Sequence, residues 1–190
     1  MFRTQMVRPR RDPVRVLPGD GVEIRPARMD DEERIRSFLE GLSVQTQTLR
    51  FFTGVGRPAA SMVRALLAVD DRHDALLAVC GDTVVGHAMS FRGDGPGGGA
   101  GGVTGGPPGA EGVAVEIAVV VADDWQGRGL GSRLVRRLVR RAVAGGARTL
   151  GMDVLGGNRK VLNMIRREWP EAVMKASSGN VEVSTKIGLA

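Results

Sequence analysis

The sequence of 190 residues contains no tyrosine, one cysteine, Cys80, and two histidines, His73 and His87. A single cysteine excludes an intrachain disulfide and a thiolate metal cluster. The two histidines lie in different segments, so their spacing does not favour a zinc site, and we expect no metal cofactor. The absence of tyrosine excludes any mechanism that uses a phenol as general acid.

Long apolar runs are also missing, because no stretch of about 18 apolar residues occurs. The basic N-terminus is not followed by the apolar region of a secretory signal. We therefore expect a cytoplasmic protein with no membrane partner. Residues 1–21 contain five arginines and three prolines and are predicted to be a flexible basic tail, and residues 22–190 a single domain.

Basic charge is in surplus, with a formal net charge of +6. Such a surplus is typical of proteins that bind nucleic acid. The arginines between Leu130 and Ala144, however, alternate with apolar residues and form the solvated side of an amphipathic helix. Five phenylalanines and two tryptophans give no stacking platform, so we do not expect nucleic-acid binding.

Glycine is abundant, with 28 residues, and 11 of them lie in the segment Gly93–Gly112. This segment has no apolar pattern with which to build a core or a strand ladder. It is predicted to be a mobile loop. It is not flanked by a strand and a helix in the way that a phosphate-binding loop requires, so we assign it no catalytic role.

Outside the tail and the glycine-rich segment, the spacing of apolar residues predicts strands and helices in alternation. Strands are predicted at 22–27, 75–80, 83–91, 113–121 and 149–155, followed by a hairpin around Ser177–Asn180. Helices are predicted from an Asp30 cap, from a Ser43 cap, from Pro58, over Leu130–Ala144 and from Asn158 to Glu168. Hairpins mixed with crossover helices predict an α/β domain of three layers around a mixed sheet.

The segment that carries chemistry is Val113–Ser132. Its apolar strand leads into a turn with three glycines in five residues, and a helix follows at once. Glycines allow backbone N–H groups to approach a ligand closely, and the helix N-terminus adds partial positive charge. This arrangement predicts a pyrophosphate site, although the spacing alone is also compatible with a tight structural turn.

This segment resembles the acetyl-CoA signature of the GNAT acyltransferases, Q/R-x-x-G-x-G/A, with Gln126, Gly129 and Gly131 in place. The order of elements over roughly residues 22–188 is similar to that of the family. The segments IRPARMDD, LSVQTQTLRFF and AVEIAVVVADDWQGRGLG are similar to the catalytic domain of bacterial protein lysine acetyltransferases of the Pat type. The resemblance implies a GNAT-like splayed mixed sheet and acetyl-CoA as co-substrate.

The resemblance also implies roles for particular residues. Glu116 occupies the position of the general base, and Asn158 lies near the pantetheine or the thioester. The backbone of the strand would bond the pantetheine arm like an added strand. The residues implied in binding acetyl-CoA are Val119, Val120, Val121, Gln126, Gly127, Arg128, Gly129, Leu130, Gly131, Ser132 and Asn158.

Chemistry gives an independent reason for the role of Glu116. An amine attacks a thioester only when neutral, yet a free lysine titrates near pH ~10.4. A carboxylate within hydrogen-bond reach can remove the proton, and its position between Val115 and Ile117 predicts partial desolvation and a raised pKa. A glutamate facing solvent at the sheet margin is the alternative. His87, on the neighbouring strand, is predicted to be structural rather than a proton relay.

One position departs from the family. Many members carry a tyrosine seven residues after the asparagine that corresponds to Asn158, and here Ile165 stands there. A CoA thiol has a pKa near ~8.5, so the thiolate can leave without a phenol. The expected function is acetyl transfer to a protein lysine; a small-amine acetyltransferase and a CoA-sensing module without turnover remain alternatives. The acceptor, the acyl preference and the oligomeric state are left open.

Overall fold

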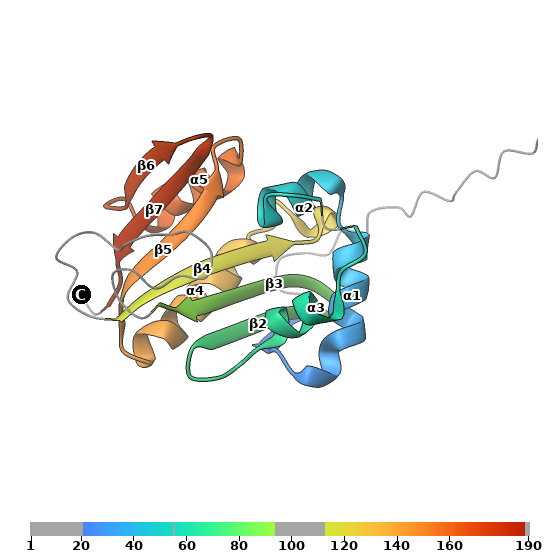
Figure 1. Cartoon of the computed structure of the whole chain (residues 1–190). Helices are drawn as coiled ribbons and strands as arrows, with labels where there is room; N and C mark the ends of the chain where they lie inside the picture. The colour runs from blue at the N-terminus through green and yellow to red at the C-terminus, as the bar shows by residue number, and fades with distance from the viewer. Residues whose placement is uncertain (1–20, 55, 94–112, 189–190) are drawn as a thin grey trace, which may run out of the picture.

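A computed structural model of the protein describes residues 21–54, 56–93 and 113–188 (Figure 1). Apart from Gly21 and Gly93, the predicted tail and the predicted glycine-rich loop lie outside these residues. The described strands form one sheet in the order β1-β2-β3-β4-β5-β7-β6, and every neighbouring pair is antiparallel except β4 and β5. Their bounds are β1 Val22–Pro26, β2 His73–Cys80, β3 Thr83–Arg92, β4 Val113–Val121, β5 Ala147–Leu155, β6 Val173–Ser177 and β7 Asn180–Lys186.

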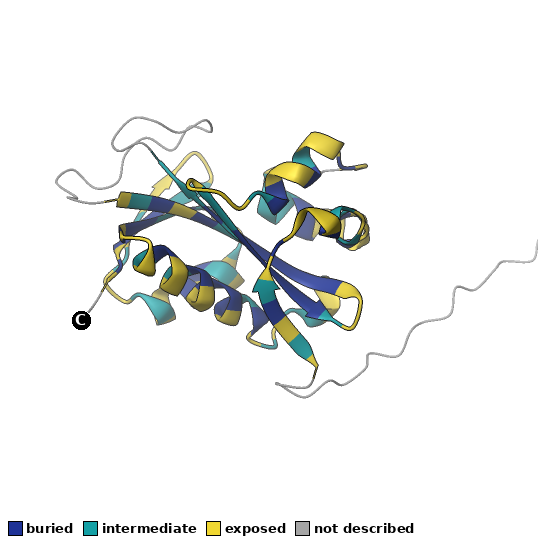
Figure 2. Cartoon of the chain, turned by 90° about the horizontal axis from the view of Figure 1, so that it is seen from below, coloured by how far each residue is buried: buried dark blue, intermediate teal, exposed yellow. Residues whose placement is uncertain are grey.

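Helices cover both faces of this sheet, which confirms the predicted three-layer α/β class. Apolar residues of α1 and α3 pack with β2, β3 and Val120 of β4 on one face. Those of α4 and α5 pack on the other, over a core that extends from β1 to β7 (Figure 2). The helices are α1 Glu32–Gly41, α2 Val44–Phe51, α3 Ala60–Leu67, α4 Leu130–Ala144 and α5 Arg159–Glu168, with short 3₁₀ turns η1 Met29–Asp31 and η2 Asp123–Trp125.

The arginine-rich helix is amphipathic, as its sequence predicts. Leu130, Leu134 and Leu138 are buried against the sheet. Its arginines point to solvent, where Arg136 donates to Glu168 at 2.6 and 2.7 Å and Arg141 to Asp74 at 2.6 and 3.0 Å. Part of the arginine surplus therefore pairs with carboxylates of this same chain.

The two parallel strands stay together over only part of their length. β4 and β5 pair between Val113–Glu116 and Ala147–Gly151. Beyond this point β4 stays paired with β3 as far as Val121, and β5 stays paired with β7 as far as Leu155. The strands diverge there in Figure 1. We call the opening between residues 117–121 and 152–155 the fork; it is the predicted splay of the sheet.

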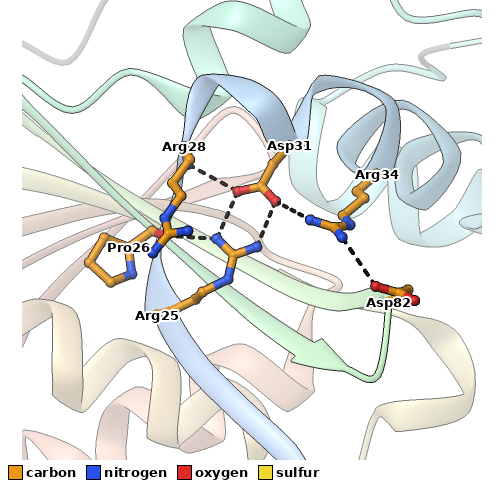
Figure 3. A network of polar contacts seen from close by, with 6 residues as sticks. All are labelled: Arg25, Pro26, Arg28, Asp31, Arg34 and Asp82. Atoms are coloured by element: carbon orange, nitrogen blue, oxygen red, sulfur yellow. Dashed lines mark hydrogen bonds and ion pairs between the residues drawn. The ribbon is translucent and has the colours of Figure 1, made fainter.

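The first helix begins differently from the prediction. Asp31, not Asp30, is the residue before α1, and its fully buried carboxylate accepts hydrogen bonds from three arginines (Figure 3). Arg25 donates to it at 2.6 and 2.7 Å, Arg34 at 3.1 Å and the backbone N–H of Arg28 at 3.0 Å. The network thus ties β1 to α1. Pro58 likewise precedes α3 rather than forming its first turn, because the helix begins at Ala60.

The Asp31 network predicts a pH-dependent stability. The hydrogen bonds from Arg25, opposed by burial, lower the pKa of Asp31 to about 2. Its stabilising effect is therefore complete above the unfolded value, near ~3.9, and is lost as the pH falls toward 2. Replacing Asp31 with asparagine should lower the free energy of unfolding by about 1–2 kcal/mol at pH 7, since Arg34 is partly solvated.

Urea denaturation at pH 7 and pH 3 tests this prediction. The difference between wild type and Asp31→Asn should shrink at the lower pH. The exposed neighbour Asp30 provides the matched control, and Asp30→Asn should cost little at either pH. Equal losses for the two variants would show that the Asp31 network does not stabilise the fold.

Candidate active site

The turn between β4 and α4 has the backbone of an anion-binding loop. Gly127 and Gly129 have φ values of 76° and 77°, a region that favours glycine. Gly129 is also the N-cap of α4, and Arg133 is the first residue of the helix to donate back to it. The N–H groups of Leu130, Gly131 and Ser132 therefore have no partner within the helix and lie at its positive end. This backbone fits a pyrophosphate.

The side chain of Gln126 fixes this loop in place. Its amide nitrogen donates to the carbonyl of Val121 at 3.2 Å and to the hydroxyl of Thr46 at 3.1 Å, and its amide oxygen accepts from Lys160 at 3.1 Å. Its backbone N–H donates to the carbonyl of Asp123. Gln126 thus holds α2, β4 and α5 together, and its backbone N–H is not free for a phosphate.

Other predicted ligand-binding residues also have structural contacts. The side chain of Leu130 is buried in the core, so this residue presents only its backbone to a ligand, and the Ser132 hydroxyl accepts from Arg167 at 3.2 Å. Arg128 lies over the Trp125 ring, 5.2 Å from its centroid. Asn158 caps α5, because its side-chain oxygen accepts from the N–H of Val161 at 3.3 Å.

The fork lies between the two groups of predicted residues. Val119, Val120 and Val121 form the free end of β4, and Asn158 follows the free end of β5. Their strands diverge there, so among the described strands one edge of β4 has no partner. An extended chain such as pantetheine fits an edge of this kind.

Glu116 stands at the root of the fork. It is the last residue of β4 that pairs with β5, opposite Gly151, and it is exposed. Partial desolvation raises the pKa of its carboxyl above the ordinary value, the charge of Asp153 raises it further, and the charge of Arg50 opposes both. The pKa of Glu116 is therefore shifted upward, as the sequence predicts.

His87 belongs to the core rather than to the reactive centre. It is 1% exposed, and its Nε2 lies 2.7 Å from the carbonyl oxygen of Leu66 in the last turn of α3. Burial and the charge of Arg50 lower its pKa to about 4, so it is neutral at physiological pH. Its Nε2–H satisfies a helix-end carbonyl, in agreement with the predicted structural role.

The sequence interpretation missed several polar groups near the site. Asp123, the first residue of η2, accepts from the backbone and hydroxyl of Ser43 at 2.9 and 2.7 Å and from Thr46 at 2.7 Å. It thereby ties the start of α2 to the loop before α4. Arg50 and Asp153 approach Glu116 from α2 and β5. None of these contacts has a local sequence signal, because the partners are far apart along the chain.

None of the described helices has the length and apolar character needed to cross a membrane. The model of the acetyltransferase (GNAT) family matches residues 42–169, more than half of the chain. No curated protein matches the sequence.

Several solved structures share the fold. The GNAT domain of S. lividans PAT is 27% identical, with a TM-score of 0.73, over 87% of this chain and 90% of that one. A phosphinothricin acetyltransferase from Sinorhizobium meliloti in complex with acetyl-CoA is 14% identical, with a TM-score of 0.64, over 88% and 89%. NAA60 of Arabidopsis thaliana in complex with acetyl-CoA is 13% identical, with a TM-score of 0.63, over 87% and 98%. The chain belongs to the acetyltransferase (GNAT) family and is an acyltransferase that uses acetyl-CoA.

Proposed function

We propose that the protein transfers the acetyl group of acetyl-CoA to the ε-amino group of a lysine on another protein, with Glu116 as the general base. The observation that carries the proposal is the position of Glu116, a carboxylate with a raised pKa at the root of the fork. The similarity to the GNAT domain of S. lividans PAT, together with the Pat-type sequence segments, supports a protein acceptor.

The open sheet face beside Glu116 also favours a protein acceptor. Glu116 lies on the same face as the core of α1 and α3, but that core includes no residue of β5, β6 or β7 within the described part of the chain. On this face Val173, Lys175 and Ser177 of β6 are exposed. Of the described residues, none encloses this part of the face as a cleft would enclose a small molecule, which favours the approach of a protein segment.

Glu116 would accept a proton from the lysine ammonium, directly or through one water molecule. The neutral amine then attacks the carbonyl carbon of the thioester, and the C–S bond breaks as the nitrogen gives up its second proton to solvent and the amide forms. The free edge of β4 and the N–H groups at the start of α4 would hold the pantetheine arm and the pyrophosphate. These residues bind and orient, and Glu116 moves the proton.

The departure of CoA needs no phenol in this scheme. Ile165, at the position where relatives carry tyrosine, is fully buried in the core between α5 and the sheet. It cannot donate a proton. With a thiol pKa near ~8.5, CoA leaves as the thiolate and takes up a proton from water.

Thiol release from acetyl-CoA tests the function directly. We expect release with lysine-containing protein or peptide acceptors to exceed release with free polyamines or amino acids. Mass spectrometry of a lysate incubated with enzyme and labelled acetyl-CoA should then find the label on lysine ε-amines, and Glu116→Gln enzyme serves as the matched control for non-enzymatic acetylation. Release with small amines only would make the protein a small-molecule acetyltransferase, and no release with any amine would make it a CoA-binding module.

A further inference from the structure

Arg50 is a half-buried cation without a close carboxylate. It lies in the last turn of α2, and its Nε is buried without a hydrogen-bond partner. Its guanidinium packs on the ring of Phe51, 4.8 Å from the centroid, and forms no ion pair among the described residues. Burial lowers its pKa to about 10. A buried donor without a hydrogen-bond partner destabilises the fold, which suggests a role for the Arg50 cation beyond packing.

The charge of Arg50 acts on Glu116. α2 packs against both β4 and β5, the two strands that meet at Glu116. The electrostatic attraction between Arg50 and Glu116 favours the ionised carboxylate. Arg50 therefore opposes protonation of Glu116.

Asp153 acts on Glu116 in the opposite direction. Glu116 pairs with Gly151 across the two strands, and Asp153 follows two residues later on β5, so its side chain leaves the same face of the sheet. Gly151 has no side chain to separate the two carboxylates. Two negative charges on one face repel each other, which favours protonation of Glu116.

The acidic row continues away from the fork. Asp153 pairs with Glu182 on β7, and Glu182 pairs with Lys175 on β6. Burial and the charge of Glu182 raise the pKa of Asp153. The charged groups around Glu116 are thus Arg50 from α2 and Asp153 from β5, with Glu182 and Lys175 farther along the row.

We propose that Arg50 and Asp153 are positioning residues whose opposed charges set the proton affinity of Glu116, and with it the pH range in which the enzyme works. The inference rests on the proposed role of Glu116 as base. A general base is most effective when its proton affinity matches the working pH, because it must be ionised yet still attract a proton. Arg50 keeps Glu116 ionised, and Asp153 keeps it basic.

The pH profile of kcat/KM in four variants tests the proposal. Asp153→Asn should move the acid limb to lower pH by about half to one unit, and Arg50→Met should move it to higher pH by a similar amount. Arg50→Lys keeps the charge and should stay near wild type. Glu171→Gln, which removes an exposed charge outside this cluster, is the control and should leave the limb unmoved.

A titration of the Glu116 carboxylate separates this inference from the proposed function. Carbon-13 NMR of enzyme saturated with CoA, without acceptor, follows the carboxyl signal that Glu116→Gln removes. Opposite shifts in Asp153→Asn and Arg50→Met, matched by the pH profiles, support the proposal. If neither variant moves this titration, the inference is overturned whatever activity Glu116→Gln retains. If the Glu116 titration shifts but the pH profile of kcat/KM does not, Glu116 is not the general base. Its proton affinity then does not set the working pH range, and the inference is overturned as well.

Stability provides a readout that distinguishes a positioning role from packing. Arg50→Met removes a half-buried charge together with its unpartnered Nε, and should keep or raise the free energy of unfolding while it shifts the acid limb. A large loss of stability with an unchanged acid limb would assign Arg50 to packing alone and overturn its proposed role.

Discussion

Glu116→Gln is expected to lower kcat/KM for acetyl transfer by roughly 100-fold to 1,000-fold, within the range of general-base catalysis. Glutamine keeps the size of the side chain and cannot accept the proton of the acceptor ammonium. The residue stands at the root of the fork, whereas the loop that fits the pyrophosphate lies beyond the other end of β4. The affinity for acetyl-CoA, measured by calorimetry, should therefore stay within a factor of about two.

The pH dependence of this loss provides a further check. A free lysine amine has a pKa of ~10.4. Below this pH, the neutral fraction of the amine rises about tenfold for each unit by which the pH rises. An amine that is already neutral does not need the base, and the deficit of Glu116→Gln should shrink toward pH 9–10. Asp153→Asn, which removes a neighbouring carboxylate instead, should retain most of the activity at its own optimum. Wild-type turnover by Glu116→Gln at pH 7 would show that another group is the base.

The elements of this fold follow from apolar periodicity, because burial imposes it directly on the sequence. The spacing of Leu130, Leu134 and Leu138 predicts α4, and the residues are buried as that spacing requires. The strand β4 is apolar on both faces apart from Glu116, which predicts a central strand, and β4 lies between β3 and β5. Errors fall at helix starts, where Asp30 and Asp31 offer the same local chemistry and the hydrogen bonds from Arg25, Arg28 and Arg34 select the second.

The site was predictable only where its chemistry is local. Glycines at positive φ before a helix leave a signature within a few residues, and Gly127 and Gly129 adopt that conformation. The electrostatic environment of Glu116 depends instead on residues of α2 and β5 that the fold brings together. No spacing in the sequence predicts that the Nε of Arg50 is buried without a hydrogen-bond partner, since this follows from how α2 packs on the sheet.

Gly129→Ala is expected to weaken acetyl-CoA binding by roughly tenfold to 100-fold, equivalent to losing one or two charge-assisted hydrogen bonds. An added Cβ at this position, the N-cap of α4, meets no protein atom within 4 Å and would occupy open space in the predicted ligand loop. The φ of 77° also strains any residue other than glycine, by about 1 kcal/mol for alanine. A loss of affinity could therefore come from the ligand space or from the strain.

Gly81 separates these two causes. It has a φ of 58°, its added Cβ also meets nothing within 4 Å, and it lies in the hairpin turn between β2 and β3, outside the predicted acetyl-CoA site. Gly81→Ala should lose about as much stability as Gly129→Ala, on the order of 1 kcal/mol, because both backbones are left-handed. Acetyl-CoA is added at a concentration that saturates the wild-type enzyme. Only Gly129→Ala should then lose part of the thermal stabilisation that the ligand confers. If both variants lose the same amount of ligand-induced stabilisation, the effect comes from strain, and the pyrophosphate has no site at the predicted position. If only Gly129→Ala loses it, acetyl-CoA binds at the backbone that precedes α4.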